Sequence, residues 1–217
     1  MNKTAVVIGA TGLIGAQLLE KLLRDERYQD VWVLARRSTG IEHPKLKEKI
    51  GDLLDDAFWK FEIAVDDVFC CIGTTQAKTS DMQLYKSIDY GVPLQVAHWG
   101  LKNGMQKYLV ISSMGANKKS RIFYSRIKGQ MEDALRKMAI PRLYLLRPSL
   151  LLGNRNEFRM GEALGKFFTR VFSPLIPAKY KGIQAETVAS AMINLANSTA
   201  DSVVYESDEL RSLGSES

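Results

Sequence analysis

Short apolar runs alternate along this chain with longer segments in which apolar residues recur at helical spacing. The first pattern is typical of buried strands and the second of amphipathic helices. The runs predict strands at Thr4–Ile8, Val31–Ala35, Lys47–Ile50, Asp67–Cys71, Lys107–Ile111 and Arg142–Leu146. The alternation predicts an α/β fold of the Rossmann type, a doubly wound parallel sheet with helices on both faces.

The segments of helical period lie between the predicted strands. They predict helices near Leu13–Asp25, Asp81–Asn103 and Ser120–Ala139, and a short helical turn at Leu53–Phe58. Proline has no backbone N–H and disfavours helical geometry in the residue before it. We therefore expect Pro93 to divide the second helix and Pro141 to end the third.

The pattern changes after Leu146. An amphipathic stretch at Phe158–Phe172 is followed by a helix near Ala185–Asn197 and a last strand at Val203–Tyr205. We interpret residues 1–217 as a single nucleotide-binding domain, in which residues 151–200 contribute a small cap on the substrate side. The polar tail Glu206–Ser217 is expected to fray.

Composition narrows the class of protein. The 217 residues are 46% hydrophobic and 25% charged, which is typical of a globular domain and excludes disordered and fibrous chains. No apolar run approaches the roughly 18 residues of a membrane span, and the early glycines argue against a signal peptide. Cys70 and Cys71 are adjacent and build no disulfide framework, so a cytoplasmic location is expected.

The net charge and the two histidines do not predict a nucleic-acid-binding or metal-binding site. The net charge is +6, and residues 117–130 hold basic residues and no acidic one. A phosphate-bearing ligand explains this basicity as well as nucleic acid does, and we expect no nucleic-acid partner. His43 and His98 have no second ligand at metal-binding spacing, so no metal site is predicted.

A glycine-rich loop, Gly9-Ala10-Thr11-Gly12-Leu13-Ile14-Gly15, follows the first predicted strand and opens the first predicted helix. Glycines let the backbone approach a pyrophosphate, and a helix N-terminus supplies N–H groups and positive dipole. The spacing differs from the G-x-G-x-x-G fingerprint, so the strand–loop–helix context carries the prediction. The loop predicts a dinucleotide site.

Arg36 and Arg37 follow the second predicted strand, where an acid usually selects NAD. A guanidinium suits the 2′-phosphate of NADP(H), so we predict that cofactor. The alternative is that both arginines are solvated surface residues. Asp52, after the third strand, either accepts from the adenine amino group or closes a turn.

Tyr124 and Lys128 are spaced to share one face of a helix. A phenol of pKa about 10 exchanges protons poorly near pH 7 unless a cation is close, and Lys128 would supply one. Ser113, at the end of the fifth strand, is our choice over Ser112 to hold a carbonyl oxygen. The alternatives are structural. Tyr124 would be an aromatic core residue with Lys128 a solvated lysine, and the two serines would cap the turn that follows the strand.

These motifs resemble the extended or atypical branch of the short-chain dehydrogenase/reductase superfamily, and more narrowly the Tat-interacting-protein family of atypical reductases. The resemblance is carried, in order, by GATGLIG, GDLLD, the run Phe69–Thr75, SSMGANKKS, FYSRIKGQME and LRPSLLLGNRNEFRMGEALGKFF. It implies a Rossmann fold, NADPH as cofactor, and reduction of a small carbonyl substrate. Related folds exist as monomers or homodimers.

The resemblance also implies residue roles. It places Gly9, Thr11, Gly12, Leu13 and Ile14 at the pyrophosphate, Arg36 and Arg37 at the 2′-phosphate, Asp52 at adenine, Ile72, Gly73 and Thr74 beside the ribose, and Tyr124, Lys128, Arg147 and Pro148 at the nicotinamide. Tyr124 would be the acid, Lys128 its pKa-lowering neighbour and Ser113 the carbonyl-positioning group. Because animal relatives are described as regulators, the alternative is an NADPH-binding sensor that acts through a protein partner.

Overall fold

The computed structural model describes residues 2–74, 79, 81–153, 177–201 and 203–215. Within them, one parallel sheet has the strand order β3-β2-β1-β4-β5-β6-β9. Its strands are β1 Lys3–Ile8, β2 Tyr28–Ala35, β3 Leu46–Ile50, β4 Asp67–Cys70, β5 Lys107–Ile111, β6 Arg142–Arg147 and β9 Val204–Glu206. This order confirms the predicted Rossmann-type fold. The strand order runs one way from β1 to β3 and the other way from β4 to β9, so it changes direction between β1 and β4. Sheets of this kind bind nucleotides at that point, beyond the carboxyl ends of the strands.

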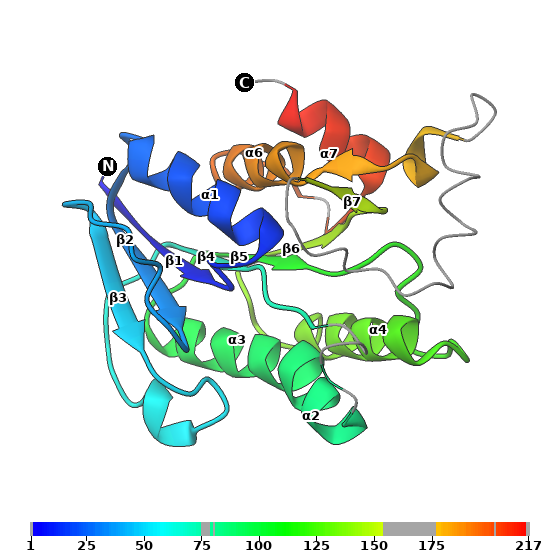
Figure 1. The fold of residues 1–217 in the computed structure, drawn as a ribbon, viewed down its shortest axis with the longest axis horizontal. Coiled ribbons are helices and arrows are strands. Elements are labelled where there is room, and N and C mark those ends of the chain that lie inside the picture. The colour runs from blue at the N-terminus through cyan, green and yellow to red at the C-terminus, as the bar shows by residue number, and fades with distance from the viewer. Residues whose placement is uncertain (1, 75–78, 80, 154–176, 202, 216–217) are drawn as a thin grey trace.

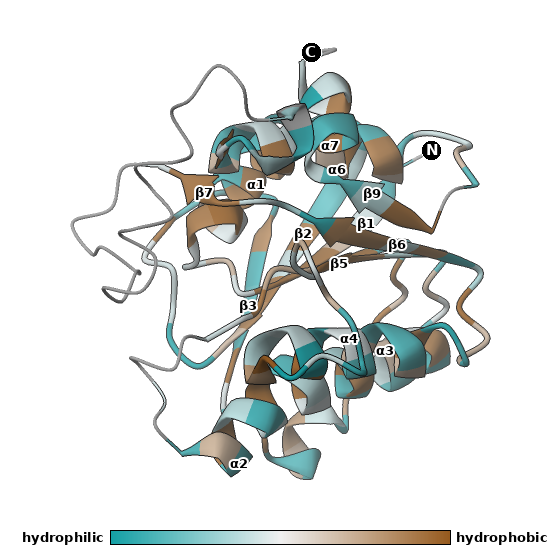
Figure 2. Ribbon diagram, turned by 90° about the vertical axis from the view of Figure 1, so that its right-hand side faces the viewer, coloured by the Kyte–Doolittle hydropathy of each residue, from teal (hydrophilic) through white to brown (hydrophobic). Residues whose placement is uncertain are grey.

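Helices form a layer on each face of the sheet (Figure 1). One layer contains α1 (Leu13–Arg24), α6 (Ala185–Ala196) and α7 (Ser207–Gly214), and the other contains α2 (Met82–Lys86), α3 (Val92–Lys102) and α4 (Phe123–Leu135). Figure 2 shows the hydrophobic strands between the two layers. Every residue of β4 and β5 is buried, which requires a sheet that is covered by helices on both faces.

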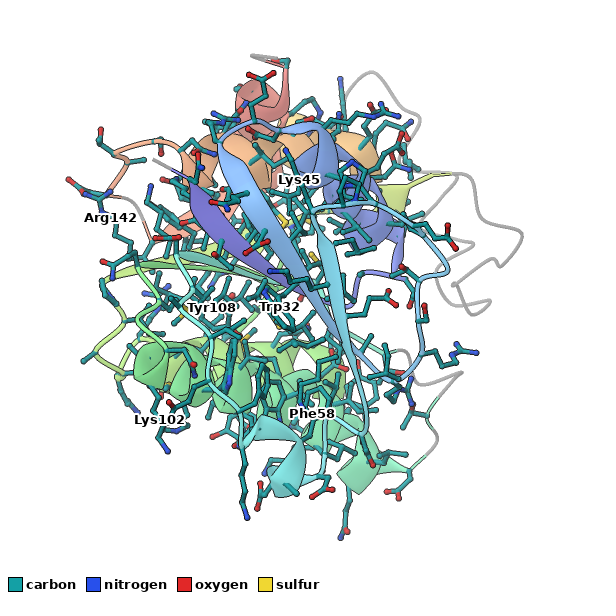
Figure 3. The ribbon with its side chains drawn as sticks, turned by 90° about the vertical axis from the view of Figure 1, so that its left-hand side faces the viewer. Trp32, Lys45, Phe58, Lys102, Tyr108 and Arg142 are labelled. Carbon is teal, nitrogen blue, oxygen red and sulfur yellow. The ribbon has the colours of Figure 1, made fainter. Side chains whose placement is uncertain are left out.

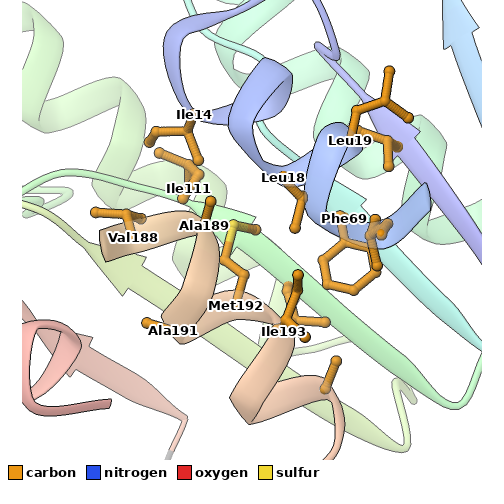
Figure 4. Packing of buried hydrophobic residues seen from close by; sticks show 14 of the residues in the cluster. Ile14, Leu18, Leu19, Phe69, Ile111, Val188, Ala189, Ala191, Met192 and Ile193 are labelled. Atoms are coloured by element: carbon orange, nitrogen blue, oxygen red, sulfur yellow. The ribbon is translucent and has the colours of Figure 1, made fainter. Parts of the chain in front are cut away.

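Each layer is fixed by its own apolar cluster. Beneath α1 and α6, Leu18 and Met192 pack over Phe69 of β4 (Figure 4). On the opposite face, Tyr108 of β5 is fully buried beside α3 (Figure 3) and donates a hydrogen bond to the Pro93 carbonyl at 2.8 Å. The central strands β4 and β5 are therefore packed on both faces of the sheet.

Between β3 and β6, the helical segments differ from the predicted ones in three places. α2 and α3 are joined by a π-helical turn, Ser87–Gly91, so the interruption comes before Pro93, which sits in the first turn of α3 where no N–H is needed. α4 begins at Phe123 and not at Ser120, because the Ser120 hydroxyl accepts the N–H of Ile122 in a turn. The predicted turn near Leu53 is a 3₁₀ turn at Asp56–Trp59.

The prediction that Glu206–Ser217 frays is wrong for the described part of that segment. Residues 207–214 form α7, whose first turn is closed by a capping box between Glu206 and Glu209. Leu210 is fully buried in the cluster beneath α1 and α6. The tail is mostly polar, and for that reason the sequence did not predict this helix. Burial of the single leucine side chain packs α7 against the protein.

The predicted cap at residues 151–200 stays a prediction. Its described part contains β7 (Leu151–Leu152) and β8 (Ile183–Gln184), which pair in parallel, the 3₁₀ turn η3 (Ala178–Tyr180), and α6. α6 belongs to the main helical layer and packs on α1 and the sheet. The amphipathic stretch Phe158–Phe172 lies outside the described residues.

Candidate functional site

The glycine-rich loop folds tightly between β1 and α1. Gly9 has φ +83°, and a Cβ there would stand 2.8 Å from the backbone carbonyl of Cys71. A Cβ on Gly15 would stand 2.1 Å from the Gly9 oxygen. No other residue type fits at these two positions, so the backbone of the loop can lie close to the ends of β1 and β4.

The loop leaves the start of α1 open to an anion. Gly12 is the N-cap of α1 and has no side chain to cap it, and no acidic residue lies in the first turn. The N–H groups of Leu13 and Ile14 have no partner within the helix. With exposed Thr11 beside them, these residues fit the pyrophosphate of a dinucleotide, which helix N-termini bind through N–H groups and dipole.

Arg36 and Arg37 lie directly after β2 and are exposed. The loop that continues from them is tied to β3, because Glu48 accepts hydrogen bonds from the Ser38 hydroxyl and from the N–H and hydroxyl of Thr39. Burial alone would raise the pKa of Glu48, but these hydrogen bonds lower it by more than burial raises it. The net pKa is therefore lowered, and the carboxylate stays ionised. The arginines thus stand on an anchored loop at the carboxyl edge of the sheet.

Asp52 lies after β3 at the same edge, as predicted, and is exposed. One of its carboxylate oxygens accepts the N–H of Leu54 at 3.0 Å, which is the turn-closing role. Both interpretations of Asp52 therefore stay open, since a carboxylate has a second oxygen that can accept from another donor.

The two serines after β5 have different surroundings. Ser112 donates to the buried carboxylate of Glu132. Ser113 is 7% exposed, and its hydroxyl has no partner among the described residues. A buried hydroxyl normally has a hydrogen-bond partner, so Ser113 is the serine with capacity for a ligand. This environment favours Ser113 over Ser112.

Arg147, at the end of β6, is bound to two carboxylates of the chain. Its Nε and Nη2 donate to Glu132 at 2.9 and 2.6 Å, and its Nη1 donates to Glu206 at 3.1 Å. These bonds raise the pKa of Arg147 and hold its guanidinium against the two carboxylates. The following Pro148 is buried and accepts the N–H of Met114 through its carbonyl. The nicotinamide contact implied for Arg147 and Pro148 stays a prediction, which the Arg147 side chain does not favour.

Lys128 projects from α4 to the end of β5 and is 2% exposed. Its Nζ donates to the Ile111 carbonyl at 3.3 Å and lies 3.0 Å from Oδ1 of the fully buried Asp89. Burial alone would lower the pKa of Lys128, but the charge of Asp89 raises it. Tyr124 lies one turn before Lys128 and is 38% exposed. The predicted tyrosine and lysine thus share one face of a helix beside the Ser112-Ser113 strand end.

Asp89 also binds the loop after β4. Its Oδ2 accepts the N–H of Thr74 at 2.8 Å, and a Cβ on the exposed Gly73 would lie 3.5 Å from Oδ1 and 3.8 Å from Lys128 Nζ. Half-buried Ile72 precedes them. The structure thus brings the residues predicted at the ribose against the Lys128–Asp89 pair.

Sequence reasoning missed Asp89 and Glu132. Both are acids within helical segments, where an acid usually faces solvent, and both are buried here beside a cation. No sequence signal marks Asp89, although the π-helical turn that carries it is a feature often found at functional sites.

Two negative findings apply to the described residues alone. The described residues contain no group of three or more His, Cys, Asp or Glu side chains that could hold a metal ion. No helix in this part of the chain combines the length and the apolar character needed to cross a membrane.

Residues 5–171 match the NAD dependent epimerase/dehydratase family. Among relatives, the mitochondrial protein FMP52 of Debaryomyces hansenii is 30% identical over 203 residues, which cover 89% of this chain and 88% of that protein. Protein HTATIP2 of Rattus norvegicus is 31% identical over 199 residues, which cover 89% of this chain and 81% of that protein. The resemblance to the Tat-interacting-protein family is confirmed.

Solved structures of low sequence identity share the fold. The enzyme WbmF of Bordetella bronchiseptica in complex with NAD+ is 17% identical, with a TM-score of 0.71 over 97% of this chain and 77% of its own. The UDP-N-acetylglucosamine 4-epimerase of Methanobrevibacter ruminantium is 21% identical, with a TM-score of 0.69 over 92% of this chain and 74% of its own. Both confirm the Rossmann architecture.

The relatives correct the predicted location. The fungal FMP52 proteins of Debaryomyces hansenii, Candida albicans and Emericella nidulans are named as mitochondrial, so the cytoplasmic prediction is wrong. The physical reason is that free cysteines argue against oxidising compartments but do not distinguish one reducing compartment from another.

Proposed function

The chain belongs to the NAD-dependent epimerase/dehydratase family, and from its site geometry we propose that it is an NADPH-dependent oxidoreductase that reduces a small carbonyl compound. One observation carries the proposal. The buried hydroxyl of Ser113, without a partner in the described chain, follows the strand whose Ile111 carbonyl binds Lys128, and Tyr124 lies one helical turn from that lysine. These positions support a site in which a hydrogen-bond donor, a proton donor and a cation serve one substrate oxygen at the end of β5.

The cofactor would be held from three sides. The N-terminus of α1 and the glycine loop would bind the pyrophosphate, and Arg36 and Arg37 would bind the 2′-phosphate. Lys128 would donate to the nicotinamide ribose from beneath Gly73. When bound, the reduced nicotinamide supplies a hydride to the carbonyl carbon.

The chain's own residues would handle the oxygen and the proton. The Ser113 hydroxyl would donate a hydrogen bond to the substrate carbonyl oxygen and fix its orientation. Tyr124 would transfer its phenolic proton to that oxygen as the carbon accepts the hydride, which completes the alcohol. The phenolate then recovers a proton from solvent, to which Tyr124 is open.

Substitution of Tyr124 by Phe tests the catalytic part of the proposal. We expect Tyr124→Phe to bind NADPH normally and to lose turnover by about 10²-fold or more, because general acid catalysis contributes about 10² to 10⁴. The control is Tyr90→Phe, because Tyr90 lies against Lys86 in a surface hollow that none of the proposed site residues line. The assay is NADPH oxidation with a panel of aldehydes, ketones and quinones. Full activity of Tyr124→Phe contradicts the mechanism.

Cofactor choice is tested separately by titration with NADPH and NADH. We expect NADPH to bind at least roughly tenfold more tightly, a difference of about 1.4 kcal/mol. The double variant Arg36→Ala/Arg37→Ala should lose this preference, and Arg142→Ala, an exposed arginine at the start of β6, should keep it. Equal affinity of the native protein for both cofactors contradicts the arginine assignment. Tight NADPH binding without turnover of any carbonyl favours a cofactor-binding regulator.

A further inference from the structure

The carboxylate of Asp89 has an acceptor that the described residues do not use. Asp89 is fully buried on the π-helical turn before α3, and its Oδ2 accepts the N–H of Thr74 at 2.8 Å. Its Oδ1 lies 3.0 Å from Nζ of Lys128, which is a charge contact, but accepts no aligned hydrogen bond among the described residues. Buried polar atoms normally have a hydrogen-bond partner, so this oxygen is an acceptor with capacity for a ligand.

Lys128 supplies the complementary donor. An ammonium group has three N–H bonds to donate. One donates to the Ile111 carbonyl at 3.3 Å, and the contact with Asp89 uses at most one more. Among the described contacts of Lys128, a donor is therefore left for a ligand. The pair thus offers a hydrogen-bond donor and a hydrogen-bond acceptor at neighbouring positions.

Both atoms border the space beside Gly73, which is exposed. A Cβ on Gly73 would lie 3.5 Å from Asp89 Oδ1 and 3.8 Å from Lys128 Nζ. Apart from the chain neighbours of Gly73, no other atom of the described residues lies within 4 Å of that position. A side chain there would cover the two polar atoms. Glycine therefore leaves the pair open to a ligand that lies over the loop after β4.

The loop is fixed at the residue that follows Gly73. The N–H of Thr74 donates to Asp89, and its carbonyl accepts from the hydroxyl of Tyr85 at 3.4 Å. The hydroxyls of Thr74 and Thr79 share a further hydrogen bond at 2.9 Å. These contacts hold the backbone of Gly73 over the pair without any ligand. The donor, the acceptor and the space beside them are thus preorganised, which lowers the cost of binding.

We propose that Asp89 is a further cofactor-binding residue, whose Oδ1 accepts a hydrogen bond from a hydroxyl of the nicotinamide ribose that lies over Gly73 and accepts from Lys128. This inference rests on the proposed function. A lysine only donates and a carboxylate only accepts, whereas a sugar hydroxyl does both. Lys128 lies one helical turn from Tyr124, so the nicotinamide half of the cofactor is the half that meets the pair. The carboxamide of that half also donates and accepts, and the experiment distinguishes it from the ribose.

The first test compares two ligands by calorimetric titration of the full-length protein. One is NADPH, and the other is adenosine 2′,5′-bisphosphate, which has the 2′-phosphate but no nicotinamide ribose. Gly73→Ala should fold, because its Cβ contacts are at ordinary van der Waals distances. We expect it to bind NADPH at least about tenfold more weakly, because hydrogen bonds to charged groups are lost, and to bind the bisphosphate normally. The matched control is Gly91→Ala, where a Cβ would meet nothing within 4 Å, and it should bind both ligands normally. Normal binding of NADPH by Gly73→Ala overturns the inference.

Asp89→Asn tests the acceptor itself, since the amide keeps the volume but has one oxygen in place of two. We expect the same selective loss of NADPH affinity, by at least about tenfold. In the Gly73→Ala protein, Asp89→Asn should cause little further loss, because the methyl group has already displaced the hydroxyl; losses that add would mean a purely structural role for Asp89 and overturn the inference. Asp133→Asn is the control, because Asp133 pairs with Lys118 and Lys137 at the protein surface.

The acetylpyridine analogue of NADPH distinguishes the ribose from the carboxamide. This analogue keeps the nicotinamide ribose, but a methyl group replaces the amide nitrogen. If Asp89 binds the ribose, Asp89→Asn should weaken binding of the analogue as much as it weakens binding of NADPH. If Asp89→Asn has no effect on binding of the analogue, Asp89 binds the carboxamide, which overturns the ribose assignment.

The outcome is separable from that of the proposed function. Selective loss of NADPH affinity in Gly73→Ala and Asp89→Asn, in a protein that oxidises no NADPH with any carbonyl probe, supports the role of Asp89 and refutes the reductase assignment. A native protein that reduces carbonyls, but whose folded Asp89→Asn variant binds NADPH normally, refutes only the role of Asp89.

Discussion

Substitution of Glu132 by Ala should destabilise the protein strongly. Glu132 is 3% exposed and accepts hydrogen bonds from Ser112 and from two nitrogens of Arg147. Removing the carboxylate leaves a buried hydroxyl without its acceptor and weakens the pairing of a guanidinium. Glu132 thus links α4 to the ends of β5 and β6.

The magnitude follows from the surroundings of Arg147. Breaking a buried ion pair costs about 3–5 kcal/mol. Arg147 keeps its bond to Glu206 at 3.1 Å, and its side chain is 21% exposed, so water compensates part of the loss. We therefore expect a decrease of about 3 kcal/mol in the free energy of unfolding for Glu132→Ala, near the lower limit of that range. Glu132→Gln keeps the volume and one acceptor, and should cost about 1.5–3 kcal/mol.

Urea denaturation followed by far-ultraviolet circular dichroism measures these differences. In a domain of this size, a loss of about 3 kcal/mol corresponds to a decrease in Tm of roughly 6–12 °C. Asp133→Ala, at the next position of α4, is the control, because its surface ion pairs should contribute no measurable stability. The double variant Glu132→Ala/Arg147→Ala should be less destabilised than the sum of the single variants, since the unpaired guanidinium is gone. A Glu132→Ala protein as stable as the native one would refute the reasoning.

Three further predictions concern the loop, the C-terminal helix and pH. Gly9→Ala should abolish NADPH binding in a titration, because its Cβ would meet the Cys71 backbone at 2.8 Å, whereas Gly40→Ala, also at positive φ but with open space, should bind normally. Leu210→Ala should lower the free energy of unfolding by about 2–5 kcal/mol in urea, since the side chain is fully buried; an unaffected midpoint would mean that α7 does not dock. Burial raises the pKa of Asp67 despite its hydrogen bonds, so the folded state binds its proton more readily than the unfolded state does. Relative to Asp67→Asn, the native protein should therefore lose stability as pH rises from the unfolded carboxyl pKa of about 3.9 through the raised folded value. Urea midpoints measured across that range for both proteins would contradict this if their difference were constant.

The sequence specified the parts of the site that depend on local order along the chain. The glycines of the first loop are required by backbone geometry that any strand–loop–helix unit of this kind shares, and the structure contains that unit at the predicted residues. The exposure of Arg36 and Arg37 also follows from local order, because they come directly after a strand whose last residues are buried. The apolar runs likewise gave the sheet strands to within a few residues, since burial on both faces requires uninterrupted hydrophobicity.

Tertiary structure decided which polar side chains meet. Asp89 lies on one helix and Lys128 on another, and Glu132 contacts residues from two strands, so these pairs depend on how separate elements pack. The same packing used Ser112 and Arg147 within the protein and left the Ser113 hydroxyl without a partner among the described residues. A sequence gives the residues that can ionise, but the charge they carry and the partner they face are set by burial and by distances of a few ångströms, which exist only after the elements have docked.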